Sequence, residues 1–155
     1  MAVWNKDRAE EIIAAHRDVA GATLPILHAL QDEFGYVPED AVPIIAAALN
    51  LSRAEVYGIV TFYHDFRRSP PGRHVLKLCR AEACQSMGAD ALATVARQRL
   101  GVEWGGTSAD GRVTLEPVFC LGLCACAPAA MIDDKVVGAL DRNRLDALLA
   151  EIRQP

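Results

Sequence analysis

RRSPPGRHVLKLCRAEAC, residues 67–84, divides the chain into two regions with different patterns. It begins with charged residues and a Pro-Pro-Gly run, which is typical of a break between structural elements. HVLKLC at 74–79 then shows the alternation that predicts a β-strand. The strand ends at Cys79, and Cys84 follows four intervening residues later. The stretch therefore predicts a boundary near residue 72, with a cysteine pair directly after the first strand.

The region before the break has the pattern of four short helices. Apolar residues recur at helical spacing in 6–20, 23–35, 40–50 and 52–66. Ser52 and Glu55 match a capping box at the start of the fourth helix, and Thr23 is a candidate N-cap for the second. We expect Val19 to lie on the apolar face of the first helix. The aromatic run TFY at 61–63 is expected to pack inside this region.

The region after the break predicts alternating strands and helices. RVTLEPVFC at 112–120 reads as a second strand, and MGADALATVARQRLG at 87–101 as a helix between the two strands. AAMID and KVVGAL, joined around Asp133 and Asp134, predict a hairpin, and DRNRLDALLAEI predicts a last helix. A helix between two strands implies that these strands are parallel, with the hairpin strands antiparallel. We therefore expect an α+β fold: a four-helix region at 1–72, then a domain at 73–155 with a mixed four-stranded sheet.

The composition excludes several classes of protein. The chain has 155 residues, of which 52% are hydrophobic and 23% charged, and its net charge is −4. Residues 1–72 hold six Lys+Arg against ten Asp+Glu, whereas residues 73–155 hold ten of each. No basic patch indicates nucleic-acid binding. No apolar run is long enough to span a bilayer, and no secretory signal is visible, so we expect a cytoplasmic protein without membrane insertion.

The five cysteines are the strongest functional signal in the sequence. In a reducing cytosol they are expected to be free, catalytic or metal-bound rather than paired as disulfides, and their odd number agrees. Cys79 and Cys84 follow the first strand, and Cys120 and Cys124 follow the second. Because parallel neighbours end at the same edge of a sheet, both pairs are expected to converge there. Cys126 is a fifth thiol close by.

Four convergent thiolates suit either a zinc ion or a binuclear iron–sulfur cluster. Gly122 lets the backbone approach closely, and an apolar shell is expected from Leu121, Leu123, Ala125 and Ala127, which favours the cluster. Free thiols or a redox disulfide are a third reading, although no CxxC motif is present. The chain also lacks a GxGxxG motif after a strand, a Walker motif and a nucleophile arrangement, so no catalytic site is expected in it.

Three stretches together resemble a known family. CRAEACQSMGADAL at 79–92, LEPVFCLGLCACAPAAMID at 115–133 and VYGIVTFYHDFR at 56–67 are similar to the thioredoxin-like [2Fe–2S] subunit of respiratory complex I and its relatives. Within that family the wording most resembles the gamma subunit of NAD-dependent, molybdenum-containing formate dehydrogenases. The corresponding subunit of NAD-reducing hydrogenase diaphorases is the alternative.

The resemblance implies a thioredoxin-like domain holding one [2Fe–2S] cluster. Cys79 and Cys84 would bind one iron and Cys120 and Cys124 the other, whereas Cys126 falls outside the shared pattern. It also implies an electron-transfer subunit of an oxidoreductase. The electrons would be exchanged with the FMN of an NAD-binding flavoprotein partner. The molybdenum cofactor and further iron–sulfur clusters would lie in a large formate dehydrogenase subunit.

Overall fold

The computed structural model of the chain describes residues 3–152 and separates into two compact units. The first is Met1–Pro70 and the second Pro71–Pro155, so the division falls within the Pro-Pro-Gly run. Each unit has a hydrophobic core of its own. The two are therefore described separately.

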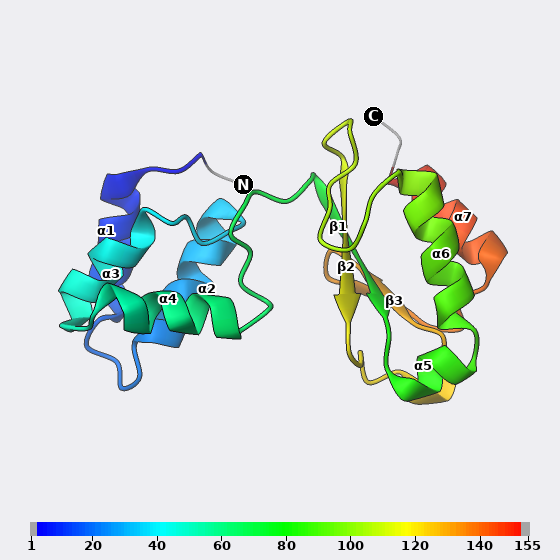
Figure 1. Cartoon of the computed structure of the whole chain (residues 1–155), viewed down its shortest axis with the longest axis horizontal. Coiled ribbons are helices and arrows are strands. Elements are labelled where there is room, and N and C mark those ends of the chain that lie inside the picture. The colour runs from blue at the N-terminus through cyan, green and yellow to red at the C-terminus, as the bar shows by residue number, and fades with distance from the viewer. Residues whose placement is uncertain (1–2, 153–155) are drawn as a thin grey trace. The chain divides into compact units, whose positions relative to one another are not determined.

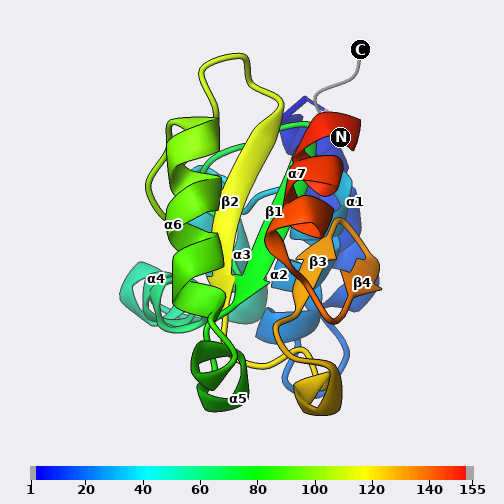
Figure 2. The same ribbon diagram turned by 90° about the vertical axis from the view of Figure 1, so that its right-hand side faces the viewer.

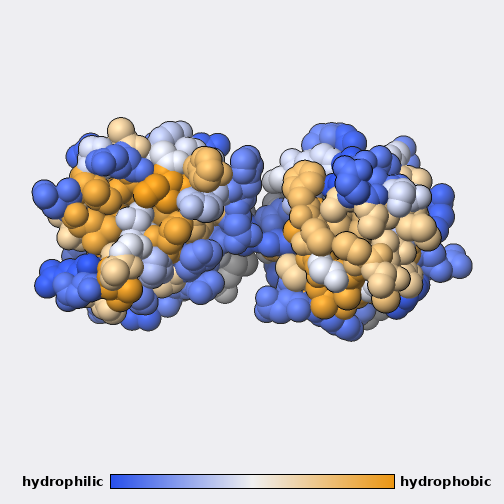
Figure 3. Space-filling model, turned by 90° about the horizontal axis from the view of Figure 1, so that it is seen from below, coloured by the Kyte–Doolittle hydropathy of each residue, from blue (hydrophilic) through white to orange (hydrophobic). Residues whose placement is uncertain are grey.

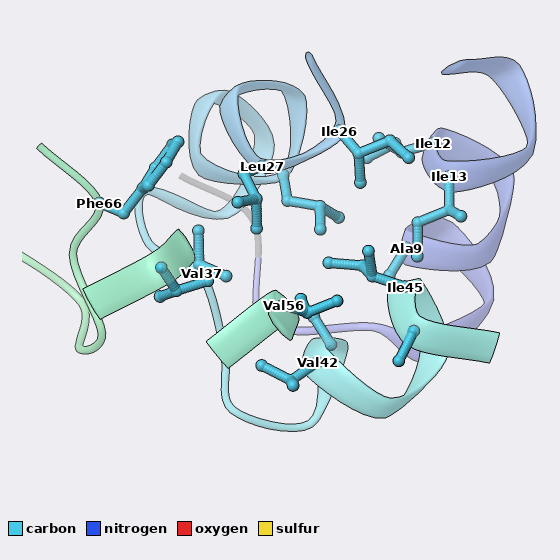
Figure 4. Packing of buried hydrophobic residues seen from close by; sticks show 14 of the residues in the cluster. Ala9, Ile12, Ile13, Ile26, Leu27, Val37, Val42, Ile45, Val56 and Phe66 are labelled. Atoms are coloured by element: carbon cyan, nitrogen blue, oxygen red, sulfur yellow. The ribbon is translucent and has the colours of Figure 1, made fainter. Parts of the chain in front are cut away.

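The first unit consists of α1 (Lys6–His16), α2 (Thr23–Phe34), α3 (Ala41–Leu49) and α4 (Arg53–Phe62) (Figure 1). Each helix contributes side chains to one core. Figure 4 shows Ile12, Ile26, Ile45 and Val56, one from each helix, meeting in the middle of the unit. Of these, Ile26, Ile45 and Val56 have no exposed surface. The predicted four-helix region is thus confirmed.

The helix ends show which terminal signals the structure uses. Ser52 caps α4: its hydroxyl accepts a hydrogen bond from the Glu55 N–H, and the Glu55 carboxylate accepts one from the Ser52 N–H at 2.8 Å. This is the predicted capping box. Thr23 was the wrong cap for α2, because Ala22 occupies the cap position in helical conformation and makes no side-chain cap bond. Thr23 is instead the first helical residue.

Two expectations about apolar side chains in this unit were wrong. Val19 lies beyond the end of α1 and is 52% exposed, since the helical period no longer applies to it. Phe62 is 73% exposed. It lies two positions after the buried Val60, which places it about 200° away around the helix. Tyr63 follows the helix in extended conformation and is also exposed, so TFY is largely a surface feature.

The second unit contains a sheet of β1 (His74–Cys79), β2 (Val113–Val118), β3 (Ala130–Ile132) and β4 (Lys135–Val137) in the order β2-β1-β3-β4. β1 and β2 are parallel, with His74 opposite Val113 and Cys79 opposite Val118. β3 runs antiparallel to both β1 and β4. Figure 2 shows this mixed four-stranded sheet face-on. The predicted α+β fold is therefore confirmed.

The helices of the second unit are α5 (Glu82–Ser86), α6 (Ala89–Leu100), the 3-10 turn η1 (Cys124–Cys126) and α7 (Arg142–Glu151). α6 and α7 cover the same face of the sheet (Figures 1 and 2). They bury Leu76 of β1 and Leu115 of β2, which are register partners with no exposed surface. The helix predicted at 87–101 is shorter than expected, and α5 was not predicted.

Among residues 3–152, no single helix is long and apolar enough to cross a membrane. α3 and α4 meet the criteria of length and composition only when taken together, and they are bent by 119° at the break between them.

Candidate metal centre

The parallel pairing of β1 and β2 brings both cysteine loops to one edge of the sheet. Cys79 is the last residue of β1, and Cys120 lies two residues beyond the end of β2. The Arg80 N–H donates to the Val118 carbonyl at 2.8 Å, which extends the pairing past the end of β1. In Figure 2, α5 and the loop that contains η1 lie together at this edge. The predicted convergence is thus observed.

The first pair of thiols is buried. Cys79 is 3% exposed and Cys84, carried by α5, is 2% exposed. The Cys79 N–H donates to the Ala129 carbonyl at 3.0 Å, which fixes the ligand strand against the segment before β3. The two thiols are hydrogen-bonded to each other. A free, buried thiol pair of this kind is a donor set well protected from solvent.

The second pair is open to solvent. The Cys120 and Cys124 sulfurs are 3.7 Å apart, and both residues are exposed. The Gly122 N–H donates to the Cys120 sulfur at 3.3 Å. Cys120 itself has φ = 98°, a conformation that side-chain-bearing residues rarely adopt. Such strain is held where the surrounding structure fixes it, and it concentrates at functional sites.

Hydrogen bonds to the Cys79 sulfur join the two cysteine loops. Burial raises the pKa of the Cys79 thiol, but hydrogen bonds donated to its sulfur outweigh burial and bring the pKa below its ordinary value. The donors are the Ala81 N–H, the Cys84 thiol and the N–H groups of Cys120 and Leu121. The last two belong to the other loop. The thiolate form, which is the form that binds metal, is therefore favoured at Cys79 by both loops at once.

The partner thiol in each pair behaves in the opposite way. Burial, followed by the hydrogen bond to Cys79, raises the pKa of Cys84, against a hydrogen bond from the Ala129 backbone. The hydrogen bond to Cys120 and its charge raise the pKa of Cys124, and the charge of Cys79 contributes further. The electrostatic influence of Cys79 on Cys124 shows that the pairs are close enough to interact across the site.

Cys126 is directed to a different neighbour. Its side chain is exposed and packs against Gly138, where an added Cβ atom would lie 2.8 Å from the Cys126 Cβ. The Cys126 carbonyl accepts a hydrogen bond from the Ala139 N–H at 2.5 Å. The residue is therefore part of the contact between the cysteine loop and the segment after β4. This placement agrees with its position outside the family pattern.

An apolar shell surrounds the thiols. Ala89 and Ala129 are buried with the first pair, and the side chains packed around them include Ala81, Val118, Leu121, Leu123 and Ala127. Figure 3 views the second unit from the cysteine edge and shows apolar residues over much of that face. Ala125 was wrongly included in the expected shell, since it is exposed within η1. Ala89 and Ala129 were missed, because nothing in the sequence relates them to the cysteines.

The arrangement of donors fits a binuclear centre. Within the described range 3–152, no three His, Cys, Asp or Glu side chains are grouped to hold a single metal ion. The four thiols instead form two close pairs. A [2Fe–2S] cluster takes two thiolates on each of its irons, and backbone N–H groups directed at sulfur are typical of such sites. Two pairs with N–H donors are the set that this cluster needs.

The model of the thioredoxin-like [2Fe-2S] ferredoxin family matches residues 9–153, which include both units. The chain belongs to this family. A thioredoxin-like [2Fe–2S] ferredoxin carries one [2Fe–2S] cluster, and the two pairs of thiols supply a donor set for it. The zinc and redox-disulfide readings of the cysteine spacing are not those of this family.

Several relatives of this ferredoxin are components of larger complexes. The E subunit of the NADH-quinone oxidoreductase of Pseudomonas aeruginosa is 39% identical over 134 residues, which cover 86% of this chain and 81% of the relative. A second E subunit of that kind of enzyme, from Rhizobium meliloti, is 38% identical, covering 96% and 88%. The NADP-reducing hydrogenase subunit HndA of Solidesulfovibrio fructosivorans is 33% identical, covering 84% and 77%.

A solved structure shows the same fold within a longer chain. The crystal structure of an air-oxidized NAD+-reducing [NiFe]-hydrogenase matches with a TM-score of 0.70 and 27% identity. The match covers 84% of this ferredoxin but 22% of the hydrogenase chain. The ferredoxin therefore corresponds to one segment of that chain.

Proposed function

We propose that the chain is an electron-transfer subunit whose cluster is bound by Cys79 and Cys84 on one iron and by Cys120 and Cys124 on the other. The observation that carries this proposal is the meeting of two thiol pairs at one edge of a parallel strand pair. The cluster, when bound, accepts and returns one electron. Cys126 is assigned no ligand role.

The protein's own part in this function is to hold the ligands and to limit water. The 3.7 Å separation of the Cys120 and Cys124 sulfurs brings two donors within reach of one iron. Backbone N–H groups at Ala81, Cys120 and Leu121 point to the Cys79 sulfur. N–H donors and burial are the means by which a protein sets the potential of such a centre. The buried first pair and the exposed second pair make the site asymmetric, with one side open toward solvent.

We place this subunit in a cytoplasmic, NAD-dependent formate dehydrogenase. The resemblance of CRAEACQSMGADAL and CLGLCACAP to the gamma subunit of those enzymes supports this context. The cluster would exchange electrons with the FMN of a flavoprotein subunit that binds NAD. A large molybdenum-containing subunit would oxidise formate. The chain contributes no substrate-binding site of its own, and the oxidoreductase activity belongs to the complex.

The relatives favour a second context for the same subunit. They are named as subunits of an NADH-quinone oxidoreductase and of an NADP-reducing hydrogenase, and the solved structure is an NAD+-reducing hydrogenase. In either complex the chain would have the same role beside a flavoprotein. Only the enzyme that supplies or consumes the electrons would differ.

Two experiments test these statements separately. Anaerobic purification of the chain should give iron and acid-labile sulfide in the ratio of one [2Fe–2S] cluster per chain, with a brown colour that bleaches on reduction. A single zinc without colour, or metal-free protein with a titratable disulfide, would contradict the electron-transfer role. For the context, the tagged chain is used to isolate its complex, which is then assayed for NAD+ reduction with formate and with hydrogen. Reduction by formate supports the first context, and reduction by hydrogen alone overturns it in favour of the second.

A further inference from the structure

A charged pair lies directly beside the buried thiols. Arg80 follows Cys79 in the chain, and its guanidinium Nη2 is 2.8 Å from a carboxylate oxygen of Asp90. The guanidinium also lies over the Trp104 ring, 5.2 Å from the ring centroid. Asp90 is in the first turn of α6, next to Ala89, which is buried together with Cys79 and Cys84. Both charges thus adjoin the shell of the first thiol pair.

Several contacts hold Arg80 in this one position. Its N–H bonds to Val118 at the end of β2, and its carbonyl accepts a hydrogen bond from the Gln85 side chain at 2.6 Å. The Arg80 side chain is 26% exposed and that of Asp90 is 60% exposed. The Arg80 Nε is buried without a hydrogen-bond partner among the described residues. Leaving a buried donor unpaired lowers stability, so stability alone does not explain this arrangement.

We propose that the Arg80–Asp90 pair sets the reduction potential of the centre, an inference that rests on the proposed function. Reduction adds one electron, and hence one negative charge, to the group held by Cys79. A cation held nearby stabilises the reduced form, and an anion opposes it. In the intact pair the two effects partly cancel. Trp104 keeps the guanidinium from swinging into water, where its charge would be screened.

The proposal predicts opposite effects for the two halves of the pair. Removing the positive charge leaves Asp90 unopposed, so the potential falls. Removing the negative charge leaves Arg80 unopposed, so the potential rises. A purely structural role predicts no such opposition, because either substitution breaks the same contact. The sign of the shift therefore separates tuning of the potential from support of the fold.

The experiment is a reductive titration of the purified full chain with dithionite, monitored by electron paramagnetic resonance. Arg80→Gln and Asp90→Asn are compared with the unaltered protein. We expect Arg80→Gln to lower, and Asp90→Asn to raise, the one-electron equilibrium constant about threefold, which is about 30 mV at 59 mV per tenfold. Arg80→Lys keeps the charge and should lie between the unaltered protein and Arg80→Gln. Both shifts should shrink at high salt, since screening weakens exposed charges.

A matched control is available on the same helix. Arg99, near the other end of α6, pairs with Asp146 at 3.3 Å. It lies nine residues from Asp90, or about 13 Å along the helix. Arg99→Gln and Asp146→Asn make the same changes of charge and should shift the potential less than their counterparts at the site.

The outcomes separate this inference from the proposed function. If the unaltered chain binds no cluster, the proposed function itself fails. If the cluster is present and Arg80→Gln and Asp90→Asn shift the potential in the same direction, or no further than the controls, the inference is overturned. If Arg80→Gln does not retain the cluster, Asp90→Asn decides alone: a raised potential supports the pair as the setting element, and an unchanged or lowered one refutes it.

Discussion

Gly138 gives the clearest test of how the cysteine loop is held. It lies after β4, and a Cβ atom added there would lie 2.8 Å from the Cys126 Cβ and 3.1 Å from the Cys126 carbonyl oxygen. Ordinary contacts of a Cβ begin at 3.4 Å, so Gly138→Ala must move the two segments apart by about 0.6 Å. Two hydrogen bonds join the same segments, from Ala139 to Cys126 and from Leu140 to Pro128. The contact has little room to adjust.

The size of the effect follows from this geometry. Overpacking of a close contact costs about 1–3 kcal/mol, and we expect the free energy of unfolding of the second unit to fall by about 2 kcal/mol. Gly58, exposed inside α4 with nothing within 4 Å of an added Cβ, is the control. Gly58→Ala should stabilise the first unit by about 0.5–1 kcal/mol, because alanine is the better helix former.

The chain's two tryptophans allow each unit to be followed alone. Urea unfolding of the metal-free protein is monitored by fluorescence, with Trp4→Phe for the second unit and Trp104→Phe for the first. The holo-protein is then challenged with an iron chelator, and Gly138→Ala should lose its visible absorbance faster than the unaltered chain. Unchanged stability and unchanged chelation in Gly138→Ala would refute the close packing of the cysteine loop on this segment.

Three further predictions concern the helix ends. Ser52→Ala removes the cap of α4 and should lower the unfolding free energy of the first unit by about 1 kcal/mol, measured by Trp4 fluorescence; an unchanged midpoint would speak against the capping box. The hydrogen bonds from the Ser52 N–H and hydroxyl lower the pKa of Glu55, so their contribution is complete above the unfolded pKa near 4.5 and is lost as the pH falls through the lower folded value. This acid sensitivity of the first unit should be smaller in Ser52→Ala, and equal slopes in the two proteins would contradict it. Arg144 Nη1 donates to the carbonyls of Gly138 and Ala139 at 2.9 and 3.0 Å, and Arg144→Ala should destabilise the second unit by about 1 kcal/mol; Arg142→Ala, in the same turn, is the control and should match the unaltered chain.

The architecture of the second unit was predictable because it depends on local patterns and one general rule. The alternation in 74–79 and 112–120 predicted two strands, and the helix between them implied the parallel pairing that the structure contains. The position of Cys79 and Cys120 at the strand ends then placed both loops at one edge. No long-range information was needed for this step.

Other features were beyond the reach of pattern. α5 has five residues, which is too short to show a helical period. The positive φ of Cys120 is imposed by the loop around it, and such values are expected for glycine rather than cysteine. The contact between Arg80 and Trp104 joins residues far apart in the sequence, so only the folded chain reveals it.

The surface position of Phe62 shows a further limit. An aromatic run beside a helical pattern suggests packing, but the buried stripe of α4 passes through Val56 and Val60 and leaves Phe62 on another face. The helical period would have predicted this, had it been applied to each residue of the run. The error lay in treating TFY as a unit.

The iron and acid-labile sulfide content of Cys79→Ser, with Cys126→Ser as its control, tests the central claim most directly. Both substitutions replace one thiol by a hydroxyl, but only Cys79 receives hydrogen bonds from both cysteine loops. After identical anaerobic purification, Cys79→Ser should contain no [2Fe–2S] cluster and Cys126→Ser a full one. Normal iron and sulfide in Cys79→Ser, or their loss in Cys126→Ser, would contradict the assignment of the four ligands.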